Sequence, residues 1–106
     1  MSDEELAESF SALSDVRRLR ALRFIAEGAP PDADCRDSVC ACHVQDHLGL
    51  SQPATSYHLK VLRQAGLVSA EKRGRWVHYR ISGDGVEVLR RFLGEIGEAA
   101  AARAIP

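Results

Sequence analysis

The chain has 106 residues and a mass of 11.6 kDa, which fits one small domain and leaves no room for a multi-domain enzyme. A composition of 45% hydrophobic and 27% charged residues is that of a globular protein, which excludes a disordered chain or a fibrous rod. No apolar run approaches the ~20 residues that span a bilayer, and the acidic start MSDEEL lacks the basic leader of a secretory signal. We therefore expect one domain over residues 1–106 that is soluble and cytoplasmic and has no membrane partner.

The net charge of −1 hides a strong segregation of charge along the chain. Residues 1–50 carry ten acidic and five basic side chains, whereas residues 51–82 carry six basic side chains against a single acid, Glu71. A concentration of positive charge of this kind is typical of a surface that binds phosphate groups. On charge alone, a solvated face balanced by acidic residues elsewhere in the fold is an equal alternative.

Two helices and a loop are predicted in the first part of the chain. An apolar stripe indicates a short first helix that ends near residue 13: Leu6, Phe10 and Leu13. Ser14 or Asp15 can cap a second helix, which Gly28 terminates. Four apolar residues are expected to form its buried face: Val16, Leu19, Leu22 and Ala26. Residues 30–37, with two prolines and three aspartates, predict an exposed loop that contains Cys35.

Two further helices joined by a tight turn predict a helix-turn-helix. The pattern becomes helical again from Ser38, and Gly49 is a natural end for this third helix. Ser51 can cap the fourth helix, in which a proline of the first turn is tolerated, and Gly66 terminates it.

The segment after the fourth helix predicts a β-hairpin with a charged tip. Apolar and polar residues alternate on both sides of a two-residue turn at 73–74. This turn would pair Ala70 with Val77 and Val68 with Tyr79, so that all four side chains share one face. Three basic residues lie at the tip: Lys72, Arg73 and Arg75.

The last predicted helix carries a narrow apolar seam of the kind that packs against another helix: Val86, Leu89, Leu93 and Ile96. The seam could belong to the core of one protomer. We favour a homodimer seam formed with the N-terminal helix, because both segments are terminal and the helix-turn-helix has its own core. The predicted fold class is mostly α with a β-hairpin, a homodimeric winged helix-turn-helix of order ααααββα.

A helix-turn-helix followed directly by a basic hairpin is a winged-helix arrangement, whose second helix enters the major groove while the wing lies along the DNA backbone. Nine residues of this helix and wing are candidates for DNA contact: Ser51, Gln52, Thr55, Ser56, Tyr57, His58, Lys60, Arg73 and Arg75. Gln52 is the candidate for reading a base, because its amide can bond an adenine edge at two points. Tyr57 is either a phosphate donor or a core residue, and His58 is expected at the surface.

The segment LSQPATSYHLKVLRQAGLV, followed by KRGRWVHYRIS, resembles the ArsR/SmtB family of metal-responsive repressors. The resemblance covers nearly the whole chain, and SDVRRLRAL at residues 14–22 is similar to the family's second-helix signature. The stretch CACHVQDHLGLSQPATSYHL resembles the region in which arsenic-type members hold a C-x-C pair ahead of the recognition helix. The resemblance implies a homodimer that represses a double-stranded DNA operator and releases it when an inducer binds.

Three cysteines within eight residues indicate a thiol-based sensor. On an ideal helix Cys40 and Cys42 would point about 200° apart, so they can hold one ion only at a distorted helix start. A helix N-terminus also favours thiolates over thiols, and thiolates select soft ions. Cys35, from the loop, can add a third sulfur. Three thiolates suit arsenite, As(III), or antimonite, Sb(III).

Several alternatives to this cysteine site stay open. Arsenic-type members often have a cysteine three residues beyond the pair, where this chain has Gln45, so the third ligand is Cys35, His43 or a group of the other subunit. His43 would move the site toward zinc or cadmium, whereas an oxidation switch would join the cysteines in a disulfide. A single cysteine such as Cys40 can also be an ordinary buried residue. An enzyme is disfavoured because the chain has neither a C-x-x-C motif nor a Gly-rich oxyanion loop.

Overall fold

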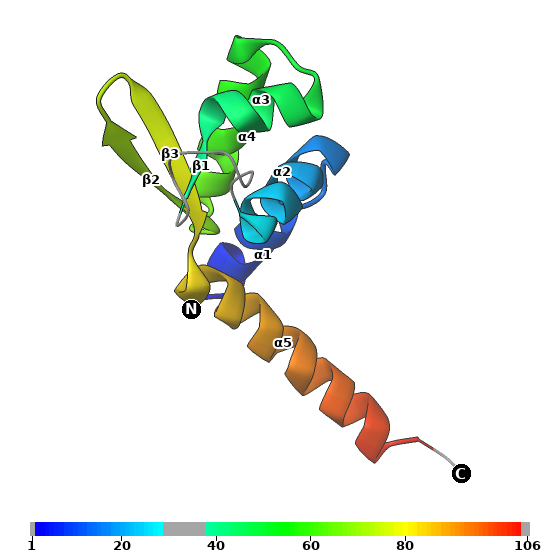
Figure 1. Cartoon of the computed structure of the whole chain (residues 1–106). Helices are drawn as coiled ribbons and strands as arrows, with labels where there is room; N and C mark the ends of the chain where they lie inside the picture. Colours follow the sequence, from blue (N-terminus) through cyan, green and yellow to red (C-terminus); the bar gives the residue numbers. More distant parts are fainter. Residues whose placement is uncertain (1, 29–37, 105–106) are drawn as a thin grey trace.

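The computed structural model describes residues 2–28 and 38–104, which form a helical body with a small sheet on one side (Figure 1). The described residues contain five helices: α1 (Asp3–Ala12), α2 (Val16–Glu27), α3 (Ala41–Leu48), α4 (Gln52–Gln64) and α5 (Gly83–Ala102). Three strands form one antiparallel sheet in the order β1-β3-β2: β1 (Val39–Cys40), β2 (Val68–Arg73) and β3 (Trp76–Ile81). The predicted winged helix-turn-helix is confirmed.

Capping side chains account for most of the helix boundaries. Ser2, Asp15, Ser51 and Ser82 stand before α1, α2, α4 and α5, and each side-chain oxygen accepts a hydrogen bond from a backbone amide of the first turn. Helix α3 ends at Gly49, whose φ of +66° is the left-handed conformation that favours glycine. Four of the five helices thus begin where a short polar side chain satisfies free amides.

The predicted buried face of α2 is wrong for three of its four residues, since only Leu22 is partly buried and packs against the core. Val16 and Leu19 are 62% and 39% exposed, and Ala26 is exposed as well. Ala21 and Ile25, at 0% and 4% exposure, form the inward face instead. Because α2 carries apolar residues on more than one side, spacing alone could not select the side that packs against α3, α4 and β3.

The sheet contains a strand that the sequence did not predict. Val39 and Cys40 form β1, which pairs with β3 through Val39 opposite Tyr79 and Cys40 opposite His78. The helix predicted from Ser38 begins three residues later, since these residues are extended. A strand of two residues is too short for an alternating pattern to reveal it.

The hairpin of β2 and β3 is confirmed, with a different register. The turn lies at residues 74–75, one residue later than predicted, so Ala70 pairs with Tyr79 rather than with Val77. Because the pairing shifts by two residues, each side chain keeps its predicted face. Gly74, with φ +64°, occupies the first turn position, where a two-residue hairpin needs a residue with positive φ.

The core lies where α1, α2, α3, α4 and the start of α5 meet the sheet. Its buried members come from every helix and strand of the fold: Ala12, Ala21, Ile25, Val39, Val44, Leu59, Leu62, Leu67, Val68, Tyr79 and Leu89. The start of α5 approaches the turn after α4 so closely that a Cβ atom on Gly85 would overlap the backbone carbonyl of Gly66. In the part of the chain that is described, no helix has the length and apolar character needed to cross a membrane.

The apolar seam of α5 divides into two parts. Leu89 is 7% exposed and Val86 packs against the same core, so the first part belongs to the protomer itself. Leu93 and Ile96 are 56% and 55% exposed, and the second half of α5 extends away from the body of the molecule (Figure 1). The predicted dimer seam is therefore wrong for Leu89, because intramolecular packing already covers that side chain.

Candidate thiol site and DNA-binding surface

The two cysteines of the CAC motif meet at the start of α3. Cys40 is the N-cap residue, in an extended conformation, and its sulfur accepts a hydrogen bond from the backbone amide of Cys42 at 3.4 Å. The two Sγ atoms are 2.7 Å apart. The change from β1 to α3 thus brings together two side chains that a regular helix would separate, and the predicted distortion of the helix start is confirmed.

The thiol of Cys42 keeps its proton at neutral pH. Burial, and next the hydrogen bond with Cys40, raises the pKa of Cys42 to about 11. The prediction that the helix N-terminus favours a thiolate is therefore not borne out for Cys42, because burial and the hydrogen bond with Cys40 raise the pKa by more than the backbone amide of His43 lowers it. An ion that binds this sulfur must displace the proton, so binding weakens as the solution becomes more acidic.

A third ligand does not join the pair within the described ranges, 2–28 and 38–104. These ranges contain no group of three or more His, Cys, Asp or Glu side chains that could hold a metal ion. The predicted zinc-type set of Cys40, Cys42 and His43 is therefore not assembled. The Nδ1 atom of His43 is buried and, among the described groups, has no hydrogen-bond partner. Cys35, the predicted third sulfur, lies outside the described residues.

Helix α4 presents a polar face to solvent. Seven of the nine predicted DNA-contacting residues are exposed or half-buried: Ser51, Gln52, Ser56, Tyr57, Lys60, Arg73 and Arg75. Tyr57 is 59% exposed, which excludes the alternative that it is a core residue. This face, together with the wing tip, lies at the opposite end of the molecule from the last turns of α5 (Figure 1).

Thr55 and His58 are corrections to the predicted DNA-contacting set, because they are only 2% and 4% exposed. The Thr55 hydroxyl donates to the backbone carbonyl of Ser51 at 2.9 Å. The Nδ1 atom of His58 lies 3.3 Å from Nη1 of Arg18, and burial lowers the pKa of this histidine. Thr55 thus bonds within its own helix, whereas His58 contacts α2 through Arg18, and both side chains are buried rather than available to DNA.

The wing carries an aromatic residue that the sequence reasoning did not single out. Trp76 is 52% exposed, and the guanidinium carbon of Arg75 lies 6.0 Å from the centre of its ring. Arg73, the other predicted wing contact, forms an ion pair with Glu71 at 3.1 Å. The sequence could have identified Trp76 by its position, because it directly follows the basic turn of the predicted hairpin.

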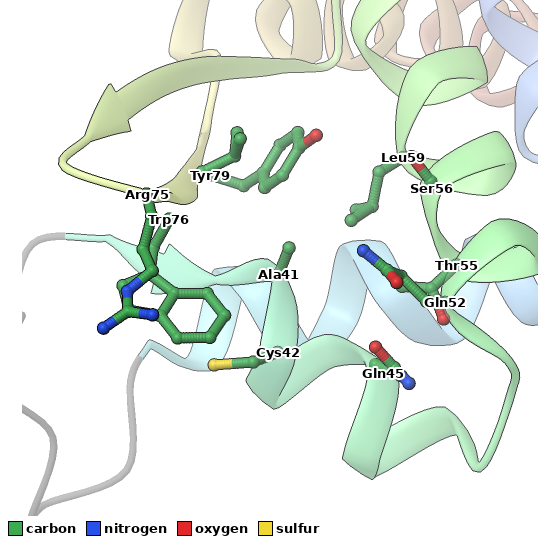
Figure 2. A pocket seen from close by; sticks show the side chains of 11 residues that line it. Ala41, Cys42, Gln45, Gln52, Thr55, Ser56, Leu59, Arg75, Trp76 and Tyr79 are labelled. Atoms are coloured by element: carbon green, nitrogen blue, oxygen red, sulfur yellow. The ribbon is translucent and has the colours of Figure 1, made fainter.

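A pocket of about 190 Å³ lies between Cys42 and several of the predicted DNA contacts (Figure 2). Its walls come from α3, α4 and the wing: Ala41, Cys42, Gln45, Gln52, Thr55, Ser56, Leu59, Arg75, Trp76, Val77 and Tyr79. Figure 2 shows the Cys42 thiol pointing from α3 toward the side on which Trp76 and Arg75 lie. The same view places the Gln52 amide at the edge of this space. One pocket is thus lined both by a candidate ion ligand and by candidate DNA contacts.

Residues 35–70 match the family model described as bacterial regulatory protein, arsR family. The chain is 37% identical over 93 residues to the uncharacterized HTH-type transcriptional regulator MJ1325 of Methanocaldococcus jannaschii, which covers 88% of this chain and 96% of that protein. It is also 37% identical over 73 residues to the arsenical resistance operon repressor of Escherichia coli. That alignment covers 69% of this chain and 56% of the repressor, so this chain matches only about half of its length.

A solved structure gives the same assignment. The ArsR-like transcriptional regulator from Rhodococcus sp. RHA1 has a TM-score of 0.74 and 31% sequence identity, covering 94% of this chain and 86% of that one. These proteins are transcriptional regulators and not enzymes, and they confirm the family resemblance seen in the sequence. The chain therefore belongs to the arsR family of bacterial transcriptional regulators.

Proposed function

We propose that this regulator is a cytoplasmic, homodimeric repressor that releases its DNA operator when a thiophilic ion binds Cys40 and Cys42. The observation that carries the proposal is the 2.7 Å contact between the two Sγ atoms, at the start of the helix-turn-helix. Cys42 also lines the pocket that Gln52 and Trp76 share. The ion would bind beside the residues that contact DNA.

Arsenite is the inducer that this donor set favours, with antimonite as its chemical analogue. Thiolates are soft ligands, which disfavours magnesium, calcium and manganese. Cys35, five residues before Cys40, is our candidate for the third sulfur of a pyramidal As(III) centre. The similarity to the arsenical resistance operon repressor of Escherichia coli supports the choice. Cadmium or zinc sensing is the alternative within the same fold, but His43 does not join the two cysteines among the described residues, so the structure gives that alternative less support.

The DNA-binding surface in this proposal consists of the exposed face of α4 and the tip of the wing. Gln52 is the base-reading residue, because its side chain is exposed in the first turn of the recognition helix. Other exposed or half-buried side chains supply contacts to sugars and phosphates: Ser51, Ser56, Tyr57, Lys60, Arg73 and Arg75. Binding to half-sites one helical turn apart requires two such surfaces, and therefore a dimer.

The second half of α5 is our candidate for the dimer interface. Leu93 and Ile96 are each more than half exposed on a helix that extends beyond the protomer's own core (Figure 1). Pairing these residues with a second copy would cover the apolar surface that the protomer leaves in water. Helix α1 packs against α5 and would lie beside the same interface.

A titration of operator binding tests the proposed function. A gel-shift assay of the wild type with arsenite, antimonite, cadmium, zinc and peroxide would show which agent releases the DNA. Cys40→Ser and Cys42→Ser should abolish the arsenite response while operator binding survives, because each change leaves only one thiol of the pair at the start of α3, and Cys35 from the loop supplies only the third bond. Cys35→Ser should give a weaker, shifted response. A Cys40→Ser protein that releases DNA at the wild-type arsenite concentration would contradict the proposed site.

An oxidation switch has one observation in its favour, the contact between the two sulfur atoms. Peroxide would take two electrons and two protons from the thiols of Cys40 and Cys42, which gives one disulfide and two molecules of water. Release of the operator by peroxide but not by arsenite would establish this second candidate. Reversal by a thiol reductant would distinguish the disulfide from irreversible oxidation.

A further inference from the structure

The thiol pair is connected to the wing by two routes that do not pass through the dimer interface. The first is the backbone ladder, in which Cys40 of β1 lies opposite His78 of β3. His78 is two residues from Trp76, at the tip end of the same strand. The second is the pocket, in which Cys42 faces the side occupied by Arg75 and Trp76 (Figure 2).

An ion held by both sulfurs replaces their direct contact. In the structure the Sγ atoms of Cys40 and Cys42 touch each other in a thiol–thiol hydrogen bond. An ion that both sulfurs bind must enter beside or between them and displace the shared proton, so at least one of the two side chains changes its position. In close-packed surroundings such a change is transmitted to the neighbours of the pair.

Both directions of this movement lead to the wing. If Cys42 moves, it moves within the pocket of which Trp76 and Arg75 form the opposite side. If Cys40 moves instead, it takes along β1, whose ladder partner is β3. Trp76 is 52% exposed and sits at the wing tip beside a cation, so its indole N–H can donate to the DNA backbone.

We infer that Trp76 is at once a DNA-contacting residue of the wing and the movable wall of the thiol pocket, so that an ion bound to Cys40 and Cys42 weakens DNA binding within each protomer by displacing the wing. This inference rests on the proposed function, and it adds the path by which ion binding at the cysteines weakens DNA binding. A change in the spacing of the two recognition helices is the alternative route. It would act across the dimer and would not require Trp76.

The only tryptophan of the chain is Trp76, so tryptophan emission reports on this side chain alone. Arsenite added to the DNA-free wild type should shift or quench this emission, and the same addition to Cys42→Ser should not. Equilibrium dialysis of the same samples would show how much arsenic is bound. Emission that stays constant while arsenic binds the wild type would overturn the inference and leave the proposed function intact.

DNA binding gives the second readout. Arsenite should lower the operator affinity of the wild type by about 5- to 150-fold, and that of Trp76→Ala by less than about twofold. Trp76→Phe, which keeps an aromatic wall, should recover most of the response. Tyr57→Ala is the matched control, because Tyr57 is similarly exposed at 59% but does not line the pocket. It should weaken operator binding and keep the full arsenite ratio.

Two further outcomes distinguish a failure of the role of Trp76 from a failure of the proposed function. A wild-type arsenite ratio in Trp76→Ala would overturn the role of Trp76 and favour the route across the dimer. If the wild type binds no arsenic in dialysis and stays on its operator at every arsenite concentration, the proposed function is overturned, and the inference with it.

Discussion

Alanine at Leu93 or Ile96 should weaken the dimer without unfolding the protomer. The two side chains are 56% and 55% exposed in the protomer, so more than half of each is available for burial in an interface. Complete burial of such a side chain contributes ~1.5–3 kcal/mol, and covering the exposed part therefore contributes about 0.8–1.7 kcal/mol. A two-fold interface contains each side chain twice, which raises the contribution to about 1.7–3.4 kcal/mol.

Each substitution should then raise the dissociation constant of the dimer by roughly 15- to 300-fold, since 1.4 kcal/mol corresponds to a factor of ten. The upper value is a limit, because alanine keeps the Cβ atom. Sedimentation velocity over a concentration series measures this constant, and circular dichroism shows whether the protomer stays folded. Leu89→Ala is the control, because Leu89 is buried in the protomer's own core and its truncation should cost ~2–5 kcal/mol of folding stability.

A dissociation constant that stays within about twofold of the wild type in both variants would refute this interface, given the burial energies above. The next surface to test would be the apolar groove that α2 forms with the end of β3 and the start of α5. It is lined almost wholly by apolar side chains: Leu13, Leu19, Leu22, Arg23, Ala26, Ile81 and Val86. Leu19→Ala would then be the informative variant.

Three further predictions follow from the fold and the DNA-binding face. Gly85→Ala should lower the free energy of unfolding by about 1–3 kcal/mol, because the added Cβ atom meets the Gly66 carbonyl. Gly83→Ala is the control, since its Cβ atom meets nothing and the change should be nearly neutral. Equal melting temperatures of the two variants in thermal melts would contradict this prediction. Burial lowers the pKa of His58, so the unfolded chain binds a proton more readily; stability should be complete above about pH 6.5 and fall as the pH decreases. A His58→Gln protein with an unchanged pH profile would contradict that assignment. Gln52→Ala should reduce sequence preference, whereas Arg75→Ala should weaken binding to all sequences and make the salt slope shallower by about one; identical effects of the two changes would contradict the docking of helix and wing.

The recognition helix and the hairpin could be predicted because short-range chemistry determines them. Ser51 caps α4 by accepting a hydrogen bond from the amide of Ala54, three residues later. Alternation along β2 and β3 determines which residues share a face, and this remained correct although the register moved by two residues. These signals lie within a few residues of one another, so one sequence is enough to read them.

The orientation of helices could not be predicted in the same way. The polar residues of α4 occupy its whole circumference, and the sequence does not show that Thr55 and His58 face inward. For His58 the partner is Arg18, which is 40 residues away in the chain and donates toward Nδ1 of the histidine. The apolar side of α2 was misassigned for the same reason, since partners distant in sequence select the buried side.

At the thiol site, the two-residue strand β1 determines whether the two sulfurs of the C-x-C motif can meet, which the motif alone does not show. Residues two apart share a face in a strand but diverge in a helix, so the C-x-C spacing alone does not say whether its sulfurs can meet. They meet here because Cys40 is extended and Cys42 is helical, and Cys40 is extended because β1 pairs with β3. The strand that brings the two sulfurs together is therefore also the strand that joins them to the wing. Any ion that changes the distance between these sulfurs acts on Cys40, which is paired directly with the hairpin that we propose contacts DNA.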